Sequence, residues 1–224
     1  MRYGPMKITF TLDGTGVYYD ILEPTHLDAL LSWAAFSEMG KIEPPATNER
    51  PMQANLPLKR WRVGRNWGWC ASAIFPVVGK DGMMTIQYWR KKFRHKRIRY
   101  CKGVVNLQSS IYREYNTPTP LLLCCTMEAY ANGDLAEVKR LLTDNVRYIG
   151  HKRAHGKGRI TGVDVTPCWQ DLSIIANGKA QRIMPLAGAP RTVRTKPPYW
   201  SNYGKIECCE IGQDYNFPTQ KQEK

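Results

Sequence analysis

Apolar and polar residues alternate along Lys7–Leu12, which predicts a half-buried β-strand. A helical pattern follows, with an apolar face formed by Leu27, Leu30, Leu31 and Ala34. We expect Thr25 as the N-cap of this helix, because Asp28 stands three residues later in a near-capping box, and Gly40 as its end. The chain therefore begins with a strand followed by a helix.

A second alternating stretch lies near the middle of the chain. Apolar residues occupy every second position from Trp67 to Phe75, and again from Met84 to Tyr88. Residues 79–82, Gly-Lys-Asp-Gly, have the composition of a turn. These patterns predict a β-hairpin in which the two alternating stretches pair with each other.

The later segments predict a strand, a helix and further strands. Leu121–Tyr130 is apolar and predicts a buried strand. Asp134 is placed to cap a helix, with Glu137 three residues later, and the apolar face of that helix comprises Leu135, Val138, Leu141 and Leu142. Val163–Val165 marks the next strand, and Ile206–Ile211 marks a last one.

The order of these elements predicts an α+β fold with an antiparallel sheet. A strand and helix near the N-terminus, and a strand, helix, loop and strand later, are typical of the two halves of a ferredoxin-like sheet. The central segment of the chain is then an insertion between those halves.

Charge is concentrated in this central segment. The chain has 224 residues, with 33 Lys and Arg against 19 Asp and Glu, a formal net charge of +14. Between Arg50 and Arg113 there are 15 Lys and Arg and one acid, Asp81, while 18 bases and 18 acids balance elsewhere. One-sided charge favours a binding surface for a polyanion, nucleic acid before membrane.

The densest charge lies in the segment 90–102, where eight of thirteen residues are Lys or Arg. So much like charge on both faces cannot pack into a core. Phe93, His95 and Tyr100 are interleaved with the cations and offer rings on which bases stack. This segment predicts an RNA-binding arm rather than an ordinary solvated face.

A glycine-rich loop spans Ile149–Ile160, with glycines at positions 150, 156 and 158 and four cations. Five residues separate Gly150 from Gly156, and Gly158 follows Lys157, so the spacing of a nucleotide-binding P-loop is absent. A dinucleotide fingerprint fails on spacing as well. The loop favours a polyanion such as RNA, and a glycine-rich surface turn with solvated charges remains the alternative.

The chain contains seven cysteines, in no Cys-x-x-Cys pair. We expect reduced thiols and neither zinc nor any other metal or cofactor, because the spacings of known zinc sites are missing. The acids form no cluster that suits a metal-dependent nuclease. No signal peptide or bilayer-spanning stretch is visible, so we expect a soluble, cytoplasmic protein without a membrane partner.

Three stretches together resemble the RAMP superfamily of CRISPR proteins, and most closely the Cas-five-like subunit of type IV CRISPR effector complexes. They are the helix start Pro24–Leu31, the capped helix Gly133–Leu142 and the loop Ile149–Arg159. The resemblance extends from about residue 6 to residue 211. The glycine-rich loop is specific for the superfamily, and the first helix points to type IV.

The resemblance implies one RAMP domain over residues 1–224 with a ferredoxin-like (RRM-like) core. It implies a basic thumb-like insertion at about 57–103, the glycine-rich loop at 149–160 and a polar tail at about 214–224. Such a subunit holds the 5′ handle of the crRNA, caps one end of the complex and takes part in antiviral and plasmid defence. Its partners are the crRNA, the backbone subunit and the large subunit, and it meets target DNA only through the complex.

Carried over by position, the resemblance implies two groups of RNA-binding residues. In the loop they are Gly150, His151, Lys152, Arg153, His155, Gly156, Lys157, Gly158 and Arg159. In the insertion they are Lys59, Arg60, Arg62, Arg90, Lys91, Lys92, Arg94, Lys96, Arg97 and Arg99.

Two other functions remain open at this point. Some RAMP proteins are metal-independent endoribonucleases that process crRNA repeats by general acid–base chemistry, and here His26 and His155 are the candidate catalytic residues. No pair of histidines is evidently arranged as acid and base, so we favour a non-catalytic binder. An unrelated general RNA-binding protein would explain the charge but not the context of the loop.

Overall fold

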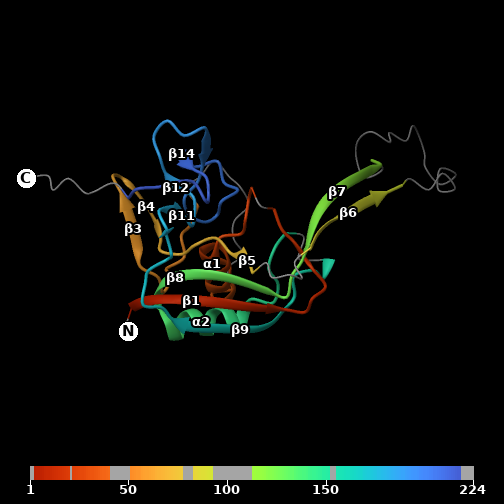
Figure 1. The fold of residues 1–224 in the computed structure, drawn as a ribbon, viewed down its shortest axis with the longest axis horizontal. Coiled ribbons are helices and arrows are strands. Elements are labelled where there is room, and N and C mark those ends of the chain that lie inside the picture. Colours follow the sequence, from red (N-terminus) through yellow and green to blue (C-terminus); the bar gives the residue numbers. More distant parts are fainter. Residues whose placement is uncertain are drawn as a thin grey trace, which may run out of the picture.

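A four-stranded antiparallel sheet forms the centre of the fold (Figure 1). β1 (Tyr3–Leu12) pairs with both β8 (Thr126–Asp134) and β9 (Ile160–Pro167), and β5 (Phe75–Pro76) pairs with the outer side of β8. The strand order is therefore β5–β8–β1–β9. The computed structural model describes residues 3–20, 22–40, 51–77, 83–92, 113–151 and 155–217.

Both helices, α1 (Leu27–Glu38) and α2 (Leu135–Asn145), share one hydrophobic core with the sheet. The alternating residues of β1 point into this core, as the period of two predicted. The predicted cap of α2 is confirmed, because Oδ1 of Asp134 accepts the backbone N–H of Glu137 at 3.2 Å. The predicted apolar face is confirmed as well, since Val138, Leu141 and Leu142 are buried and Leu135 is partly buried against the same core.

The predicted N-cap of α1 was wrong by one residue. His26 is the N-cap, and its side chain makes no capping hydrogen bond. The carbonyl of Thr25 instead accepts the backbone N–H of Ile74 at 2.8 Å, which ties the chain before α1 to the segment before β5. Asp28, expected in a capping box, is fully buried and pairs with Arg182.

The predicted hairpin between residues 67–75 and 84–88 was also wrong. β4 (Asn66–Trp69) pairs with β3 (Arg60–Val63), and β6 (Met83–Lys91) pairs over its whole length with β7 (Tyr115–Leu123). The alternating stretch after Trp69 leaves β4 and runs beside β8 and α1. Its Ala71 bridges to Ala131 and its Ala73 bridges to His26.

The apolar stretch 121–130, predicted as one strand, is divided between two sheets. β7 ends at Leu123 and β8 begins at Thr126. The carbonyl of Cys125 between them accepts the backbone N–H of Leu12 at 2.8 Å. β7 pairs with β6 and with β2 (Val17–Tyr18), and the β6–β7 ribbon extends away from the body of the molecule (Figure 1).

The C-terminal part of the chain forms two small sheets at the opposite end of the molecule from the ribbon (Figure 1). β14 (Ile206–Cys209) confirms the predicted last strand, and it pairs with two neighbours. A second hydrophobic core joins this part to the β3–β4 hairpin through Trp61. The short strands are β10 (Ile175–Ala176), β11 (Lys179–Ala180), β12 (Met184–Pro185), β13 (Arg191–Val193) and β14.

The fold is thus α+β, with mostly antiparallel sheets and two helices among the described residues. In that same part of the chain, neither helix has the length and apolar character needed to cross a bilayer. The described part of the segment 57–103, predicted as one insertion, contributes to three separate places: the β3–β4 hairpin beside the C-terminal sheets, the outer strand β5 of the central sheet and the β6 strand of the ribbon.

Candidate nucleic-acid interface

The glycine-rich loop lies between α2 and β9, as predicted, and two of its glycines are fixed by their surroundings. Gly150 and Gly158 have φ angles of +91° and +70°, in the left-handed region that favours glycine. A Cβ at Gly150 would lie 2.6 Å from the carbonyl oxygen of Tyr18, and one at Gly158 would lie 2.1 Å from that of Ile149. The loop therefore packs backbone against backbone.

Hydrogen bonds hold the loop against residues 13–18. The backbone N–H of Gly158 donates to the carbonyl of Gly16 at 2.8 Å. The ammonium of Lys157, predicted as an RNA contact, donates to the carbonyl of Thr15 at 2.8 Å. Lys157 therefore helps to anchor the loop, and its charge stays at the loop surface. These contacts make the loop a fixed platform.

The loop meets the β6–β7 ribbon at His155. The ring centroid of His155 lies 4.0 Å from that of Trp89 on β6. Tyr18, beside the loop, contacts the same side of the ribbon, because its hydroxyl donates to Oε1 of Gln87 at 2.5 Å and its ring centroid lies 5.7 Å from that of Trp89. Gln87 and Trp89 are two residues apart and share one face of β6. Loop and ribbon thus form one surface.

Three grooves follow this surface from the loop to the far end of the ribbon. The first, of about 430 Å³, is lined in part by His151. The second, of about 380 Å³, lies between Trp89, His155 and Arg113. The third, of about 550 Å³, is lined by the cations of residues 90–92 and by one acid, Glu114. A groove with rings and cations suits a strand of nucleotides, because bases stack on rings while phosphates attract the cations.

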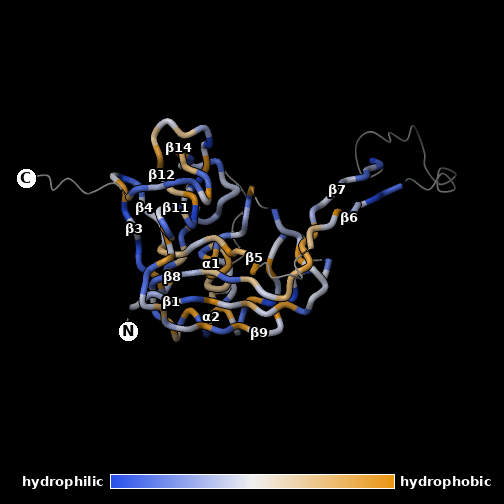
Figure 2. The backbone as a smooth tube through the Cα atoms, viewed as in Figure 1, coloured by the Kyte–Doolittle hydropathy of each residue, from blue (hydrophilic) through white to orange (hydrophobic). Residues whose placement is uncertain are grey.

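The predicted cations of the ribbon lie at its far end, where the tube in Figure 2 is strongly hydrophilic. Arg90 makes two contacts there: its Nε donates to Oδ1 of Asn116 at 3.1 Å, and its guanidinium lies 5.5 Å from the ring centroid of Tyr88. Lys91 and Lys92 are exposed beside it. The other predicted cations, Arg94, Lys96, Arg97, Arg99, Lys152 and Arg153, lie outside the described residues.

The remaining predicted loop residues lie at its surface. The backbone N–H of His151 donates to the carbonyl of Tyr18 at 3.0 Å, and the carbonyl of Arg159 accepts the N–H of Asp13 at 3.1 Å. The side chains of His151 and Arg159 are exposed. Gly156 has a φ of +75° and open space around it. The structure therefore brings the described loop residues together.

Three predicted cations are not part of this surface. Arg60 and Arg62 belong to the β3–β4 hairpin, which lies with the C-terminal sheets, and Lys59 directly precedes β3 (Figure 1). The guanidinium of Arg60 stacks 4.7 Å from the ring centroids of both Trp67 and Trp69. Among the described residues, the cations of the central segment are therefore divided between the hairpin and the ribbon.

His26, a candidate for catalysis, is buried. Only 4% of its surface is exposed, its ring stacks on Tyr199 with centroids 4.5 Å apart, and Nε2 accepts the backbone N–H of Ile183 at 3.4 Å. Burial and the charge of Arg182 hold the pKa of His26 well below its usual value of 6.5. His26 therefore packs as a neutral ring and has no surface for an RNA strand, whereas His155 is exposed.

Sequence reasoning missed the aromatic side of the surface. Trp89, Arg113 and Tyr115 line the middle groove together with His155. The sequence did carry a signal for Trp89, because this residue directly precedes the basic segment 90–102 and shares a strand face with Gln87. Arg113 and Tyr115 had no local signal, because β7 reaches β6 only through pairing across a long intervening segment.

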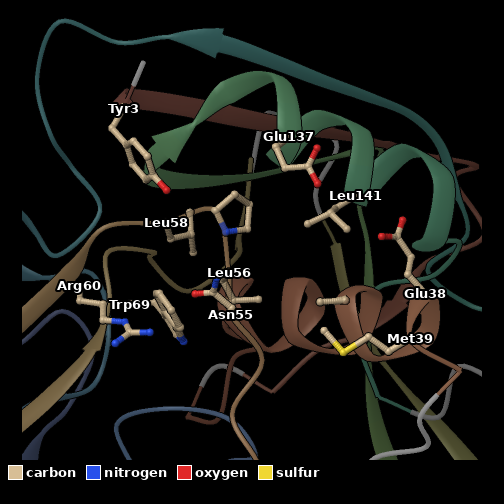
Figure 3. A pocket seen from close by; sticks show the side chains of 12 residues that line it. Tyr3, Glu38, Met39, Asn55, Leu56, Leu58, Arg60, Trp69, Glu137 and Leu141 are labelled. Atoms are coloured by element: carbon tan, nitrogen blue, oxygen red, sulfur yellow. The ribbon is translucent and has the colours of Figure 1, made fainter. Parts of the chain in front are cut away.

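Another groove, of about 700 Å³, lies between the two helices and β4 (Figure 3). Glu38 and Glu137 line it on the helix side, with Leu141 between them, and Arg60 lies at the hairpin side (Figure 3). The two carboxylates oppose the approach of phosphates, whereas each of the three grooves along the loop and ribbon has at most one carboxylate among its described residues. This groove is therefore a poorer candidate for RNA than the loop and ribbon.

The comparisons with known proteins agree with the sequence patterns. Among curated proteins, none matches the chain. A protein family does match it: residues 4–209 fit the family described as CRISPR type IV associated protein Csf3. This match spans all three stretches that resembled a type IV CRISPR protein, and it confirms that resemblance. The chain therefore belongs to the Csf3 family of CRISPR type IV associated proteins.

Proposed function

We propose that this protein is the RNA-binding subunit of a type IV CRISPR effector complex, which holds the 5′ handle of the crRNA and caps one end of the complex. One observation carries the proposal: the contact between His155 and Trp89, which joins the glycine-rich loop to the basic ribbon. The partners are the crRNA, the backbone subunit and the large subunit, and target DNA is met only through the complex. No catalytic step is assigned to the chain.

We also propose that the core is a ferredoxin-like RAMP domain and that the ribbon is its thumb. The succession β1, α1, β5, β8, α2, β9 supports this, because it follows the strand–helix–strand pattern, twice repeated, of that fold. The antiparallel order β5–β8–β1–β9 and the placement of both helices in one core also support it.

The chemistry of the surface suits a single-stranded handle. Phosphates supply affinity through the cations of the loop and ribbon, so binding weakens as salt rises. A plot of the logarithm of the association constant against the logarithm of the salt concentration should have a slope of about −0.7 for each phosphate contacted. The rings of Trp89 and His155 and the guanidinium of Arg113 offer planes on which unpaired bases stack. The fixed glycine-rich loop lies on one side of the proposed RNA-binding surface, and the ribbon lies on the other.

A binding experiment on the full-length chain tests this function. Fluorescence anisotropy compares a crRNA bearing its 5′ handle with an RNA of equal length that lacks it, over a range of salt concentrations. We expect the Trp89→Ala variant to bind the handle RNA about 5- to 150-fold more weakly, the range of one lost base–aromatic stack. Trp89→Phe retains a ring and should recover most of the affinity.

Trp169→Ala is the matched control, because Trp169 is 94% exposed and lies outside the three grooves. Equal affinity of Trp89→Ala and Trp169→Ala, with both folded, would contradict the proposal. So would binding that is insensitive to salt.

Incubation of the protein with the same RNA in the presence of EDTA tests the endoribonuclease alternative. Cleavage that disappears in the His155→Ala variant would make the chain an enzyme. Co-purification with the backbone and large subunits tests the place in the complex.

A further inference from the structure

A second group of cations and aromatic rings lies at the end of the molecule opposite the ribbon. The guanidinium of Arg60 lies 4.7 Å from the ring centroid of Trp67, and the ammonium of Lys196 lies 3.9 Å from the same centroid. Arg60 and Trp67 belong to the β3–β4 hairpin, whereas Lys196 belongs to the C-terminal part of the chain. Two cations from distant segments thus meet at one indole ring.

The alternation of the hairpin explains this arrangement. Trp61 and Val63 point into the second hydrophobic core, and a Cβ at Gly68 would lie 2.5 Å from the Trp61 ring. Trp67 stands opposite Arg62 in the register of the hairpin, on the other face. One face of the hairpin therefore packs into the second core, and the other carries Arg60, Arg62 and half-buried Trp67 beside Trp69, which is buried in the main core.

A pocket of about 270 Å³ opens beside this cluster, between the hairpin turn and the C-terminal segment. Exposed Arg65 lies on its hairpin side, and Tyr203, which is 44% exposed, lies on the other. None of the described residues that line the pocket is Asp or Glu. They are Pro51, Gln53, Arg65, Asn66, Trp67, Arg194, Thr195, Lys196, Tyr203, Gly204 and Ile206.

The floor of the pocket is a fixed cation. Arg194 is only 3% exposed, and its guanidinium donates to the carbonyl oxygens of Lys196, Pro197 and Tyr203. These carbonyls hold the guanidinium in place. A second anchor lies at the rim, where Nε2 of Gln53 donates to the carbonyl of Pro197 at 2.7 Å. The pocket is therefore a built, positively charged recess with aromatic walls.

We propose that this pocket binds a nucleotide of a single-stranded nucleic acid, with Arg65 on the phosphate and Tyr203 stacked on the base. The cations of the recess can bind the phosphate of a nucleotide, and the exposed ring can stack on its base. An acidic peptide would contact the cations but would leave the ring unused. A duplex hides the faces of its bases and cannot stack on Tyr203. The site stands apart from the loop and ribbon, and it does not depend on the function proposed for them.

Photocrosslinking and binding measurements on the full-length chain test the site. The probes are a short uridine RNA and a thymidine DNA of equal length, and the variants are Arg65→Ala and Tyr203→Ala, singly and combined. Both side chains are exposed, so the variants keep the fold. In a Trp89→Ala background, we expect the double variant to lose at least about fivefold in the remaining affinity, the smallest effect of one lost stack. Ultraviolet crosslinks should map to the peptide that contains Tyr203.

Lys179→Ala is the matched control, because Lys179 is an exposed cation of the C-terminal sheets outside the pocket. Unchanged affinity of the double variant, or crosslinks confined to the loop and ribbon, would overturn the site. An effect of the pocket variants together with none of Trp89→Ala would support the site and contradict the handle function. Tighter binding of RNA identifies the guide strand as the ligand, and tighter binding of DNA identifies a strand of the target.

Discussion

At the scale of single residues, glycine is needed in the loop for two different reasons. Gly156 and Gly158 have similar φ angles of +75° and +70°. Gly156 has nothing within 4 Å of an added Cβ, whereas at Gly158 that atom would lie 2.1 Å from the carbonyl oxygen of Ile149. Of these two, only Gly158 combines a left-handed φ with a direct steric conflict, as Gly150 also does against the carbonyl oxygen of Tyr18, so Gly158 and Gly150 carry the docking of the loop.

This difference predicts the outcome of a matched pair of substitutions. Gly156→Ala should cost about 1 kcal/mol of unfolding free energy, the price of one left-handed residue. Gly158→Ala should cost at least about 2 kcal/mol more, because the loop must also move away from Ile149. Urea unfolding followed by circular dichroism measures both. Equal costs would show that the close approach at Gly158 does not limit the loop.

At the scale of elements, charged side chains join the ends of α1 and α2. The carboxylate of Glu38 on α1 accepts hydrogen bonds from both terminal nitrogens of Arg140, at 2.7 and 3.0 Å, and from Nδ2 of Asn145, at 2.9 Å. Hydrogen bonds from Arg140 and Asn145 lower the pKa of Glu38 from 4.5 to about 2. The contact between the helices is therefore formed by the ionised carboxylate.

The link predicts a pH dependence of stability. A carboxylate whose pKa is lowered in the folded state stabilises it above pH 4.5, and that contribution is lost as the pH falls toward about 2. We expect Glu38→Gln to be less stable than the natural chain at neutral pH and to approach it in acid. Urea unfolding at several pH values measures the difference. Glu210→Gln, an exposed change after β14, should show no such trend; a pH-independent deficit of Glu38→Gln would refute the ionic link.

At the scale of the whole molecule, Arg182 joins three parts of the fold. Its fully buried guanidinium donates to the carbonyl of Ala71 at 2.8 Å, to Asp28 of α1 at 3.1 Å and to the carbonyl of Thr195 at 2.7 Å. The hydroxyl of Tyr199 also donates to Asp28, at 2.8 Å. The segment after β4, the first helix and the C-terminal part thus meet at one cation.

Removal of this cation should destabilise the whole chain. We expect Arg182→Met to cost about 3–5 kcal/mol of unfolding free energy, because it leaves the charge of Asp28 buried without its partner. The double variant Arg182→Met/Asp28→Asn should recover part of the loss. Lys179→Met breaks the exposed pair with Asp214 and should cost less than about 1 kcal/mol. Additive costs at Arg182 and Asp28, from thermal or urea unfolding, would contradict the coupling.

Local patterns determined several elements without the structure. β1, α2 with its cap at Asp134, the loop before β9 and the strand at β14 all follow from periods and capping residues that act within a few positions. The positive charge of the central segment and the cations of the glycine-rich loop also indicated a polyanionic ligand, because both are visible within short stretches of sequence. The family match bears out the type IV resemblance that these patterns carried.

Tertiary structure decided how these pieces meet. The partner of Met84–Tyr88 is β7 rather than the stretch after Trp67, because strand pairing depends on contacts far apart in the sequence. The same pairing places Trp89 against His155 and separates the ribbon from the hairpin of Arg60. The sequence by itself determined which residues favour helix or strand and which segments suit binding to a polyanion. Only packing determined that the described cations of the central segment lie in two separate places and that His26 is a buried ring, since burial and proximity arise from the whole chain.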